Sequence, residues 1–365
     1  MKKKVRFFIS TLEGGGAERV LVDLLTQLDL TDYDVSLLTL YGGVYRKRIP
    51  ANIRYKCIIK GKNIFSRLLF KLLLHCPKKL FVKLFFKEKY DVEIAYLEGI
   101  PTRFLAALKR KVVKIAFIHC DISSKNIIAP FYRDNDECLK EYKSYSKVCF
   151  VSKKCQESFE TIIGNLDNAH VIHNVLDYER IKRMSLERNS LDYVTKGLKL
   201  ITVGRLAPEK NYACLLNVIA ELEKKYDFEL WILGEGDERK NLENIISIKQ
   251  IKSVRLLGFK TNPYSYIRKA DWFISSSLSE GYSTVALESI ALGVPVLTTN
   301  TAGMQEILEG KYGKIVENSE KGLIQGLTDI FENQIQYDCF KNAVVNRSKN
   351  LNCREILDEY MKLIS

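Results

Sequence analysis

Two basic side chains follow a predicted strand in the second half of the sequence, within Gly204-Arg-Leu-Ala-Pro-Glu-Lys210-Asn. The apolar run at 198–203 predicts that strand, so Arg205 and Lys210 would lie at its carboxyl end. Arginine can bind a phosphate group through two parallel hydrogen bonds, and lysine adds a mobile positive charge. The segment therefore indicates a phosphate-binding site, although two solvated surface cations would give the same pattern.

Two glutamates, Glu280 and Glu288, lie on either side of a predicted helix start. Ser283 and Thr284 between them are good helix N-caps, and the amide groups of a first helical turn attract anions. One carboxylate before the phosphate site and one after it could bind hydroxyl groups on either side of a diphosphate. The alternative for Glu288 is an ordinary residue on a helix surface.

A glycine-rich loop formed by Gly14, Gly15 and Gly16 separates a predicted strand at 5–9 from a predicted helix at 17–28. Without Cβ atoms the backbone can pass close to a ligand, and the helix N-terminus behind it favours an anion. The spacing fits neither a dinucleotide-binding fingerprint nor a P-loop. By itself, the loop is also compatible with a plain tight turn.

The elements that must position these residues alternate as short apolar runs and longer amphipathic stretches. Predicted strands lie at 5–9, 35–40, 92–97, 113–118, 148–151 and 170–172, and then at 198–203, 229–233, 254–257, 272–275 and 295–298. This alternation predicts parallel sheets built from right-handed crossovers. The polar segment 176–196 between the halves is predicted to be a linker. We therefore predict an α/β protein with two doubly wound domains and a ligand in the cleft between them, at the carboxyl ends of the strands.

Most of the net charge of +13 lies in one segment, residues 60–90, which contains nine basic residues and a single acidic residue, Glu88. The basic residues are Lys60, Lys62, Arg67, Lys71, Lys78, Lys79, Lys83, Lys87 and Lys89. Many leucines and phenylalanines lie between them, and Pro77 divides the segment into two predicted helices. This mixture is typical of interfacial helices, whose apolar side enters the acyl chains while lysines meet anionic headgroups. The alternative is an ordinary core face with a solvated lysine face, and no nucleic-acid-binding motif accompanies the charge.

The composition of the chain indicates its number of domains and its cellular compartment. The 365 residues include 46% hydrophobic and 28% charged residues, as in an ordinary soluble chain of two or three domains. Nine scattered cysteines without a C-x-x-C pair indicate free thiols in a reducing compartment. The apolar run after the first lysines is too short for a signal peptide, and no stretch is long enough to span a membrane. We therefore expect a cytoplasmic protein.

The combined motifs resemble those of the retaining GT-B glycosyltransferases of family 4. That family has a glycine-rich GGxE-type loop, a G-R-x-x-x-x-K element and an E-x₇-E element. The corresponding segments here are Gly14 to Glu18, Gly204 to Lys210, and Glu280 to Glu288, in the same order and across nearly the whole chain. The resemblance implies a GT-B fold with two Rossmann-like domains facing a cleft. It implies an acceptor-binding domain at 1–178, a nucleotide-sugar-binding domain at 179–345, and a last helix within 346–365 that crosses back to the first domain.

Residue roles follow from the resemblance position by position. Arg205 and Lys210 would bind the donor's diphosphate, and Glu288 would hold the ribose hydroxyl groups. Glu280 would contact the donor sugar. Five further positions would line the donor site, namely Gly204, Gly234, Gly236, Ser283 and Thr284.

Two positions in the first half also receive roles from the resemblance. Gly15 and Gly16 would let the first loop approach the donor and the acceptor. His119 matches a histidine that follows a strand and lies near the sugar, although a structural histidine with satisfied hydrogen bonds is the alternative.

Two other segments received no role from the resemblance. Relatives usually have Asn-Gly-Val-Asp at the end of the first domain, whereas this chain has Asn174-Val-Leu-Asp177 without the glycine. Asp134-Asn-Asp136 looks like the metal motif of the other large glycosyltransferase fold, but we interpret it as carboxylates at a helix start. We expect no metal cofactor, because Arg205, Lys210 and helix amide groups would replace the cation.

The resemblance thus implies a retaining hexosyltransferase that moves a hexose or N-acetylhexosamine from a nucleotide-sugar, expected to be UDP-linked. The expected acceptor is an undecaprenyl-diphosphate-linked saccharide in bacterial capsule, exopolysaccharide or related glycan synthesis. Residues 60–90 would associate peripherally with the inner face of the cell membrane, and no nucleic acid is expected as a partner. The alternatives are a GT-B nucleotide-sugar epimerase and a non-catalytic basic membrane-binding protein.

Overall fold

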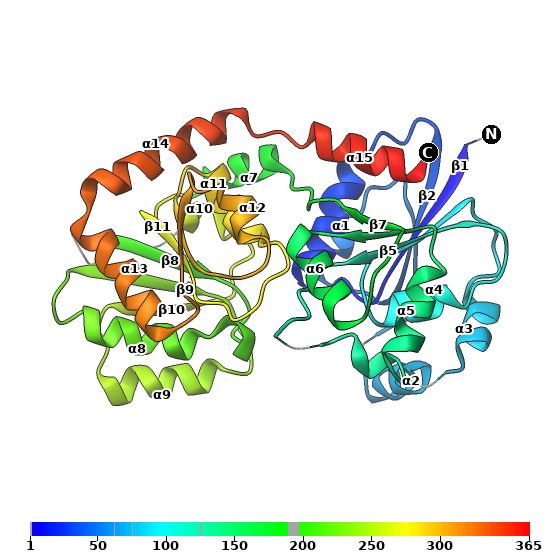
Figure 1. Cartoon of the computed structure of the whole chain (residues 1–365), viewed down its shortest axis with the longest axis horizontal. Coiled ribbons are helices and arrows are strands. Elements are labelled where there is room, and N and C mark those ends of the chain that lie inside the picture. Colours follow the sequence, from blue (N-terminus) through cyan, green and yellow to red (C-terminus); the bar gives the residue numbers. More distant parts are fainter. Residues whose placement is uncertain (1, 62, 75, 125, 189–196) are drawn as a thin grey trace. The chain divides into compact units, whose positions relative to one another are not determined.

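A computed structural model describes residues 2–61, 63–74, 76–124, 126–188 and 197–365. The chain forms two compact units (Figure 1). The first unit consists of residues 1–177 together with 353–365, and the second unit consists of residues 178–352.

The first unit is built on a seven-stranded parallel sheet in the order β3-β2-β1-β4-β5-β6-β7. Its strands are β1 (Lys3–Ile9), β2 (Tyr33–Tyr41), β3 (Arg54–Ile59), β4 (Val92–Ala95), β5 (Val113–Ile118), β6 (Lys147–Phe150) and β7 (Ala169–Val171). Its helices are α1 (Gly16–Gln27), α2 (Ile64–Leu74), α3 (Lys78–Phe85), α4 (Ile100–Ala106), α5 (Asn135–Lys143), α6 (Lys153–Ile162) and α15 (Arg354–Ile364). Val5 of the central strand β1 is buried opposite Val35 and Val92, so apolar residues fill the middle of the sheet.

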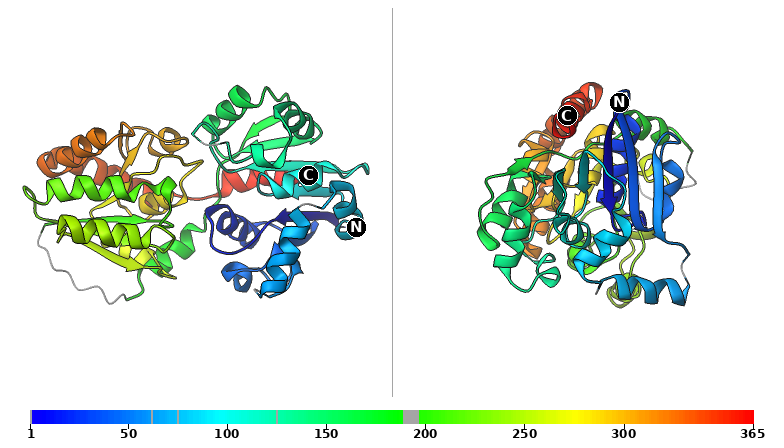
Figure 2. Two further views of the ribbon diagram at one scale, coloured as in Figure 1. Left: turned by 90° about the horizontal axis from the view of Figure 1, so that it is seen from below. Right: turned by 90° about the vertical axis from the view of Figure 1, so that its right-hand side faces the viewer.

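The second unit repeats this architecture with a six-stranded parallel sheet in the order β10-β9-β8-β11-β12-β13. Its strands are β8 (Leu198–Val203), β9 (Phe228–Leu233), β10 (Val254–Gly258), β11 (Trp272–Ser275), β12 (Val296–Thr299) and β13 (Gly313–Val316). Its helices are α7 (Tyr178–Ser185), α8 (Tyr212–Leu222), α9 (Arg239–Lys249), α10 (Tyr264–Ile267), α11 (Thr284–Ala291), α12 (Met304–Leu308), α13 (Glu320–Glu332) and α14 (Gln334–Asn350). Helices cover both faces of each sheet, as the two further views in Figure 2 show.

The predicted fold class, two doubly wound α/β units, is confirmed. The strand order reverses between β1 and β4 in the first sheet and between β8 and β11 in the second. Doubly wound folds bind their ligands at such a switch point. Two of the predicted segments, the linker and the last segment, differ from the structure in their organisation. The predicted linker 176–196 contains helix α7, whose Tyr178 and Ile181 are buried, while residues 189–196 lie outside the described residues. Residues 346–352 belong to the second unit rather than to the last segment, because α14 continues to Asn350.

The last helix, α15, belongs to the core of the first unit. Tyr360 is buried, its ring stacks on Phe117 with centroids 5.4 Å apart, and its hydroxyl group lies 3.1 Å from that of Tyr96. Leu363 and Ile364 are buried on the same helix. Helix α15 therefore packs against Tyr96, which directly follows β4, and against Phe117 of β5, the strand that leads to His119.

Candidate active site

The loops after β8 and β9 lie in direct backbone contact at the carboxyl edge of the second sheet. A Cβ atom on Gly234 would lie 1.8 Å from the Gly204 carbonyl oxygen, and one on Gly236 would lie 2.2 Å from the Leu206 carbonyl oxygen. A Cβ atom on Gly204 would meet the Tyr212 hydroxyl group at 2.8 Å. The three glycines predicted for the donor site are therefore required first for loop packing, whatever ligand the loops bind.

Replacing Gly234 by alanine is expected to destabilise the second unit. The residue has φ +149°, and its new methyl group would overlap the Gly204 carbonyl group. Strained backbone and overpacking together should lower the free energy of unfolding by about 2–5 kcal/mol. Urea denaturation measures the change. Gly310→Ala is the matched control, because Gly310 has φ +66° with no heavy atom near its Cβ position. Equal losses in both variants would contradict the packing argument.

Lys210 and Glu280 form an ion pair at the carboxyl ends of β8 and β11, with 2.5 Å between Nζ and Oε1. The Ser277 hydroxyl group donates a second hydrogen bond, of 2.7 Å, to the same Glu280 oxygen. Both ion-pair partners are largely buried. Burial disfavours the ammonium group, but the adjacent Glu280 carboxylate outweighs burial and raises the pKa of Lys210. Lys210 is therefore positively charged at neutral pH.

A small pocket surrounds this ion pair. Its lining includes Thr202, Tyr212, Ser275, Ser276 and Ser283 in addition to the ion pair itself. The Ser276 hydroxyl group donates to the Lys210 carbonyl oxygen at 2.8 Å, which fixes the β11 loop against the β8 loop. The structure thus brings Lys210 and Glu280 together from sequence positions 70 residues apart, a pairing that the sequence did not predict.

Arg205 lies on the same loop but is more exposed than Lys210. Its guanidinium group donates to Glu209 at 2.9 Å, and 74% of its side chain is accessible to solvent. An exposed ion pair of this kind contributes little to stability. The side chain can therefore leave Glu209 for an anionic ligand at small energetic cost.

Helix α11 begins where the sequence predicted. Ser283 is its N-cap, and the serine side chain accepts a hydrogen bond from the Ala286 amide group at 3.4 Å. Thr284 is the first helical residue. Glu288 is fully buried, so its interpretation as an ordinary surface residue is wrong. Burying a carboxylate is costly unless it is paired or hydrogen-bonded, so full burial distinguishes Glu288 from an ordinary surface glutamate.

In the first unit, the glycine-rich loop is held by its own glutamate. The Glu18 carboxylate accepts hydrogen bonds from the backbone amide groups of Gly14, at 2.9 Å, and Gly15. Gly15 is the N-cap of α1, and Gly16 is the first helical residue. The Glu18 carboxylate thus occupies the amide groups that the sequence suggested for a ligand. The tight Gly-Gly-x-x-Glu spacing was the signal for this capping interaction.

His119 directly follows β5, as predicted, and its imidazole ring is surrounded by aromatic rings. The rings of Tyr96 and Phe117 lie 5.0 Å and 6.1 Å from it between centroids. Burial lowers the pKa of His119 to about 3, although a hydrogen bond to the Tyr96 carbonyl group opposes this. The ring is therefore neutral at physiological pH. His119 and the glycine-rich loop belong to the first unit, whereas Arg205, Lys210, Glu280 and Glu288 belong to the second.

Asp134 is a helix N-cap, as interpreted from the sequence. Its side chain accepts a hydrogen bond of 2.7 Å from the Glu137 amide group at the start of α5. The sequence missed Ser277, which fixes Glu280, and Glu98, whose carboxylate accepts a hydrogen bond from the His119 amide group. Both follow predicted strands closely, which was the available signal.

Two doubly wound parallel sheets, with a lysine–glutamate pair and a capped helix at the switch point of the second, agree with the GT-B architecture implied by the resemblance. Residues 14–180 match the model of the glycosyltransferase family 4, and residues 184–347 match that of the glycosyl transferases group 1. The chain therefore belongs to these glycosyltransferases, which confirms the resemblance seen in the sequence.

Similar proteins agree with this assignment. The chain is 27% identical over 99% of both chains to a Campylobacter jejuni N-acetylgalactosaminyltransferase that acts on N-acetylgalactosamine-N,N'-diacetylbacillosaminyl-diphospho-undecaprenol. A second N-acetylgalactosaminyltransferase of that organism, which acts on a longer undecaprenol-linked saccharide, is 25% identical over 99% of this chain and 98% of its own. Among solved structures, Anabaena HepE in complex with UDP has a TM-score of 0.75 at 18% identity and covers 98% of both chains. The last similarity shows the fold alone.

Proposed function

We propose that this glycosyltransferase moves a hexose or N-acetylhexosamine from a UDP-sugar to a hydroxyl group of an undecaprenyl-diphosphate-linked saccharide. The Lys210–Glu280 pair at the carboxyl ends of β8 and β11 carries the proposal, because it places a buried positive charge where a nucleotide diphosphate would bind. The names of the two Campylobacter relatives support the acceptor class, and the UDP complex of HepE supports the nucleotide. The pathway would assemble a capsule, an exopolysaccharide or a related glycan.

The reaction proposed here retains the anomeric configuration. The bond between the sugar C1 and the β-phosphate oxygen breaks, and a bond between C1 and the acceptor oxygen forms on the same face. The acceptor proton passes to the departing diphosphate, which takes up the electron pair of the broken bond. Arg205, Lys210 and the amide groups at the start of α11 would stabilise that developing charge. Because these groups supply the positive charge, we propose that no metal cofactor is needed.

Glu280 has two proposed tasks. In the structure its carboxylate holds Lys210 and is itself held by Ser277. With a donor bound, Lys210 could turn its ammonium group to the diphosphate, and the released Glu280 oxygen could accept a sugar hydroxyl. Glu288 would bind the ribose hydroxyl groups on the same helix, α11.

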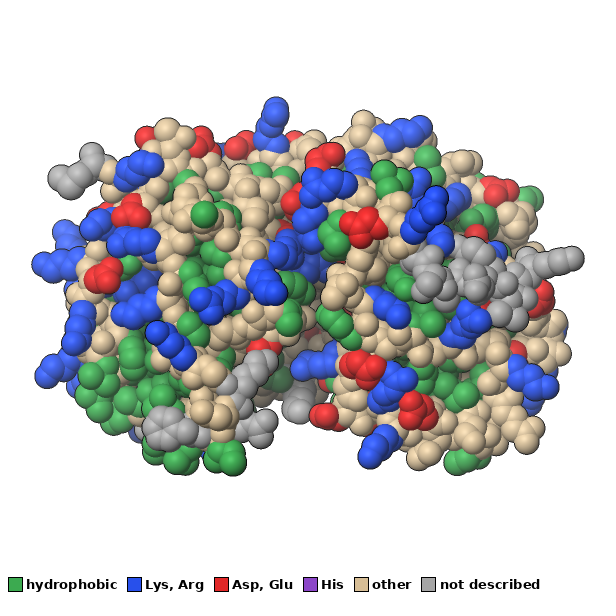
Figure 3. Space-filling view, turned by 180° about the vertical axis from the view of Figure 1, so that it is seen from behind, with side chains coloured by type: hydrophobic (Ala, Val, Ile, Leu, Met, Phe, Trp, Pro, Cys, Tyr) green, Lys and Arg blue, Asp and Glu red, His purple; other side chains and the backbone are tan. Residues whose placement is uncertain are grey.

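Residues 60–90 are proposed to bind an anionic membrane surface at the inner face of the cell membrane. None of the described helices is long and apolar enough to span a membrane. Helices α2 and α3 nevertheless expose large apolar side chains, including 85% of Ile64 and 62% of Leu72. In Figure 3, hydrophobic side chains gather at the lower left, in the region of α2, near lysine and arginine side chains. Leu68, Leu80 and Leu84 are also exposed, which extends the apolar surface onto α3.

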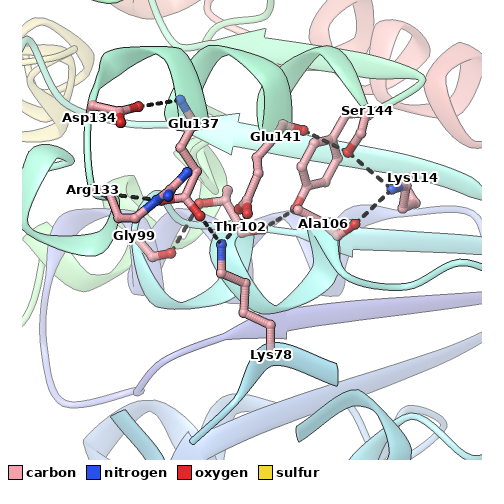
Figure 4. Close-up of polar contacts among 11 residues, drawn as sticks. Lys78, Gly99, Thr102, Ala106, Lys114, Arg133, Asp134, Glu137, Glu141 and Ser144 are labelled. Carbon is pink, nitrogen blue, oxygen red and sulfur yellow. Dashed lines mark hydrogen bonds and ion pairs between the residues drawn. The ribbon is translucent and has the colours of Figure 1, made fainter. Parts of the chain in front are cut away.

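The lysines of this segment have different surroundings. Lys79, Lys83, Lys87 and Lys89 are exposed, whereas Lys62 and the side chain of Arg67 lie outside the described residues. Lys78 is engaged within the protein, because it pairs with Glu137 at 3.0 Å and also with Glu141 on α5 (Figure 4). The Arg133 amide group and the Lys78 ammonium group lower the pKa of Glu137 to about 2. Lys78 therefore fixes α3 to α5, and the exposed lysines remain available for lipid headgroups.

Donor binding can be tested by thermal unfolding with a panel of nucleotide-sugars. UDP-glucose, UDP-galactose and their N-acetylhexosamine counterparts should raise the unfolding temperature, because a ligand that binds only the folded state stabilises it by mass action. GDP-mannose should have a smaller effect. The best donor is then incubated with a synthetic undecaprenyl-diphosphate-linked disaccharide. Transfer would support the proposal, whereas release of a free epimer without acceptor would identify an epimerase, and no binding or turnover would support a non-catalytic membrane protein.

A further inference from the structure

A basic turn follows β2 at the carboxyl edge of the first sheet. This 3-10 helical turn, η1 (Val44–Arg48), contains Arg46, Lys47 and Arg48 in succession. Strand β2 lies between β1 and β3, and the three strands are parallel. Their carboxyl ends therefore meet at one edge, where the glycine-rich loop follows β1 and Lys60 follows β3.

The turn packs directly against the segment that leads into the glycine-rich loop. The Tyr45 amide group donates a hydrogen bond of 3.2 Å to the Leu12 carbonyl oxygen. A Cβ atom on Gly43 would lie 2.1 Å from the same oxygen, so this close approach requires a glycine. The basic turn is therefore fixed beside the loop that follows β1.

The three basic residues of the turn have different surroundings. Arg48 forms an ion pair with the buried Asp23 of α1, so its charge is compensated within the protein. Arg46 and Lys47 are exposed, and neither forms an ion pair among the residues that the structure describes. Two neighbouring positive charges on the turn are thus available to an anion.

Arg46 is held in place while its hydrogen-bond donors stay available. Its guanidinium carbon lies 5.5 Å from the centroid of the Tyr55 ring on β3, which is a cation–π contact. The Tyr55 hydroxyl group lies 3.0 Å from the Thr39 hydroxyl group on β2, and this contact fixes the ring. The guanidinium group donates no hydrogen bond to a described residue, so it can bind a phosphate group through two parallel hydrogen bonds.

Helix α2 adjoins the same edge of the sheet. Tyr41 ends β2, and its hydroxyl group donates a hydrogen bond to the Ser66 carbonyl oxygen of α2. The Tyr41 and Phe70 rings lie 5.1 Å apart between centroids. The Ser66 hydroxyl group donates to the Lys60 carbonyl oxygen at 3.1 Å, which connects α2 to the end of β3. The helix with the exposed apolar side chains is therefore bonded to the ends of β2 and β3.

The order of the strands places the basic turn between two regions that a lipid-linked saccharide would reach. Helix α2 adjoins β3 at one side, and the switch point, where doubly wound folds bind ligands, lies between β1 and β4 at the other. A lipid-linked saccharide has three parts in fixed order, the isoprenoid chain, the diphosphate and the saccharide. With the isoprenoid chain in a bilayer beside α2 and the saccharide at the switch point, the diphosphate passes the end of β2.

We infer that Arg46 and Lys47 bind the diphosphate group of the lipid-linked acceptor. Arg46 donates two hydrogen bonds to one phosphate, and Lys47 adds a second positive charge. The inference rests on the proposed function and deepens it, because it assigns the acceptor's diphosphate to residues outside the proposed membrane segment. The turn then recognises the diphosphate whatever saccharide it carries.

The test compares two acceptors that carry the same disaccharide. One is linked to diphosphate and a short isoprenoid chain that dissolves without vesicles, and the other is a neutral alkyl glycoside. Replacing Arg46 and Lys47 together by glutamine should lower kcat/KM for the diphosphate-linked acceptor by about 10- to 100-fold, because hydrogen bonds to a charged group are lost. The alkyl glycoside should react equally with the wild type and the variant, and calorimetry should show unchanged UDP binding.

Geranyl diphosphate gives a readout that does not depend on turnover of the neutral acceptor. With the UDP-sugar at saturation, it should inhibit the wild type competitively against the diphosphate-linked acceptor. Its inhibition constant should be at least about 10-fold higher for the double variant, again because hydrogen bonds to a charged group are lost. Geraniol, which has no diphosphate, should inhibit both proteins equally weakly.

Replacing Lys109 and Lys111 by glutamine is the matched control. Both lysines are exposed in the same unit and precede β5, at the opposite edge of the sheet. This variant loses the same charge and should keep the kinetics of the wild type with the diphosphate-linked acceptor. Circular dichroism confirms that each variant is folded.

Three results would overturn the diphosphate site while transfer by the wild type still supported the proposed function. The first is an equal loss with both acceptors, and the second is an equal loss in the control variant. The third is unchanged kcat/KM of the Arg46–Lys47 variant with the soluble acceptor together with release from phosphatidylglycerol vesicles, which would mean that the turn binds lipid headgroups. Absence of transfer by the wild type to either acceptor would overturn the proposed function and this inference with it.

Discussion

Simultaneous replacement of Arg205 and Lys210 by alanine is expected to abolish measurable sugar transfer. Each cation would stabilise the charge on the departing diphosphate, and losing one such group typically lowers kcat by about 10²–10³-fold. We expect the double variant to lose at least about 10³-fold in kcat, with Lys210→Ala causing most of the loss because Lys210 is the more buried cation. Single-turnover transfer of radiolabelled sugar measures the chemical step directly.

A matched control separates this effect from a general loss of charge. Lys224→Ala removes an exposed lysine of the same unit and should leave kcat unchanged. Lys210→Ala also leaves Glu280 without its cation, so Lys210→Ala with Glu280→Gln tests whether the loss comes from an unpaired carboxylate. If the Glu280 substitution restores turnover, Lys210 serves the structure rather than the diphosphate. Full activity of the Arg205–Lys210 double variant would contradict the proposed mechanism.

Neutralising four exposed lysines of the basic segment should release the protein from anionic vesicles. Replacing Lys79, Lys83, Lys87 and Lys89 by glutamine removes about 1 kcal/mol of attraction per residue. Together this amounts to about 4 kcal/mol, or about 10³-fold weaker partitioning. Co-sedimentation with vesicles of phosphatidylglycerol and phosphatidylethanolamine, at low and at high salt, measures the change.

The control for this experiment removes the same charge elsewhere. Glutamine at the exposed Lys224, Lys240, Lys249 and Lys252 lowers the net charge equally but lies in the second unit. This variant should remain bound to vesicles. Equal release of both variants would mean that net charge alone attracts the protein to the surface. Binding of the wild type to neutral vesicles with unchanged strength would contradict the electrostatic part of the proposal.

The central strands of both sheets were predictable, because they are buried on both faces and appear in the sequence as continuous apolar runs. The two missed strands, β3 and β13, are edge strands. Their sequences, Arg-Tyr-Lys-Cys-Ile-Ile and Gly-Lys-Ile-Val, include lysines that an edge tolerates and that interrupt the apolar pattern. Helix α7 was missed because its apolar residues are few among charged ones, although Tyr178 and Ile181 are buried.

The candidate site was predictable where a motif follows a strand, as for Lys210, Glu280 and His119. The contacts between such residues were not, because they depend on which strands become neighbours. Lys210 and Glu280 meet because β8 pairs directly with β11 in the sheet, although β9 and β10 lie between these two strands in the sequence. Glu98 meets the His119 amide group for the same reason, through the pairing of β4 with β5.

The position of α15 in the first unit has a consequence for biosynthesis. A ribosome that has completed residues 1–177 must still translate residues 178–352 before the helix that carries Tyr360 emerges. At about 5–20 residues per second, this delay is about 10–40 s. During that time Tyr96 and Phe117, which hold the His119 ring, lack their partner from α15. The nascent first unit therefore exposes apolar surface beside His119, and this interval is when chaperone binding would matter most to the chain.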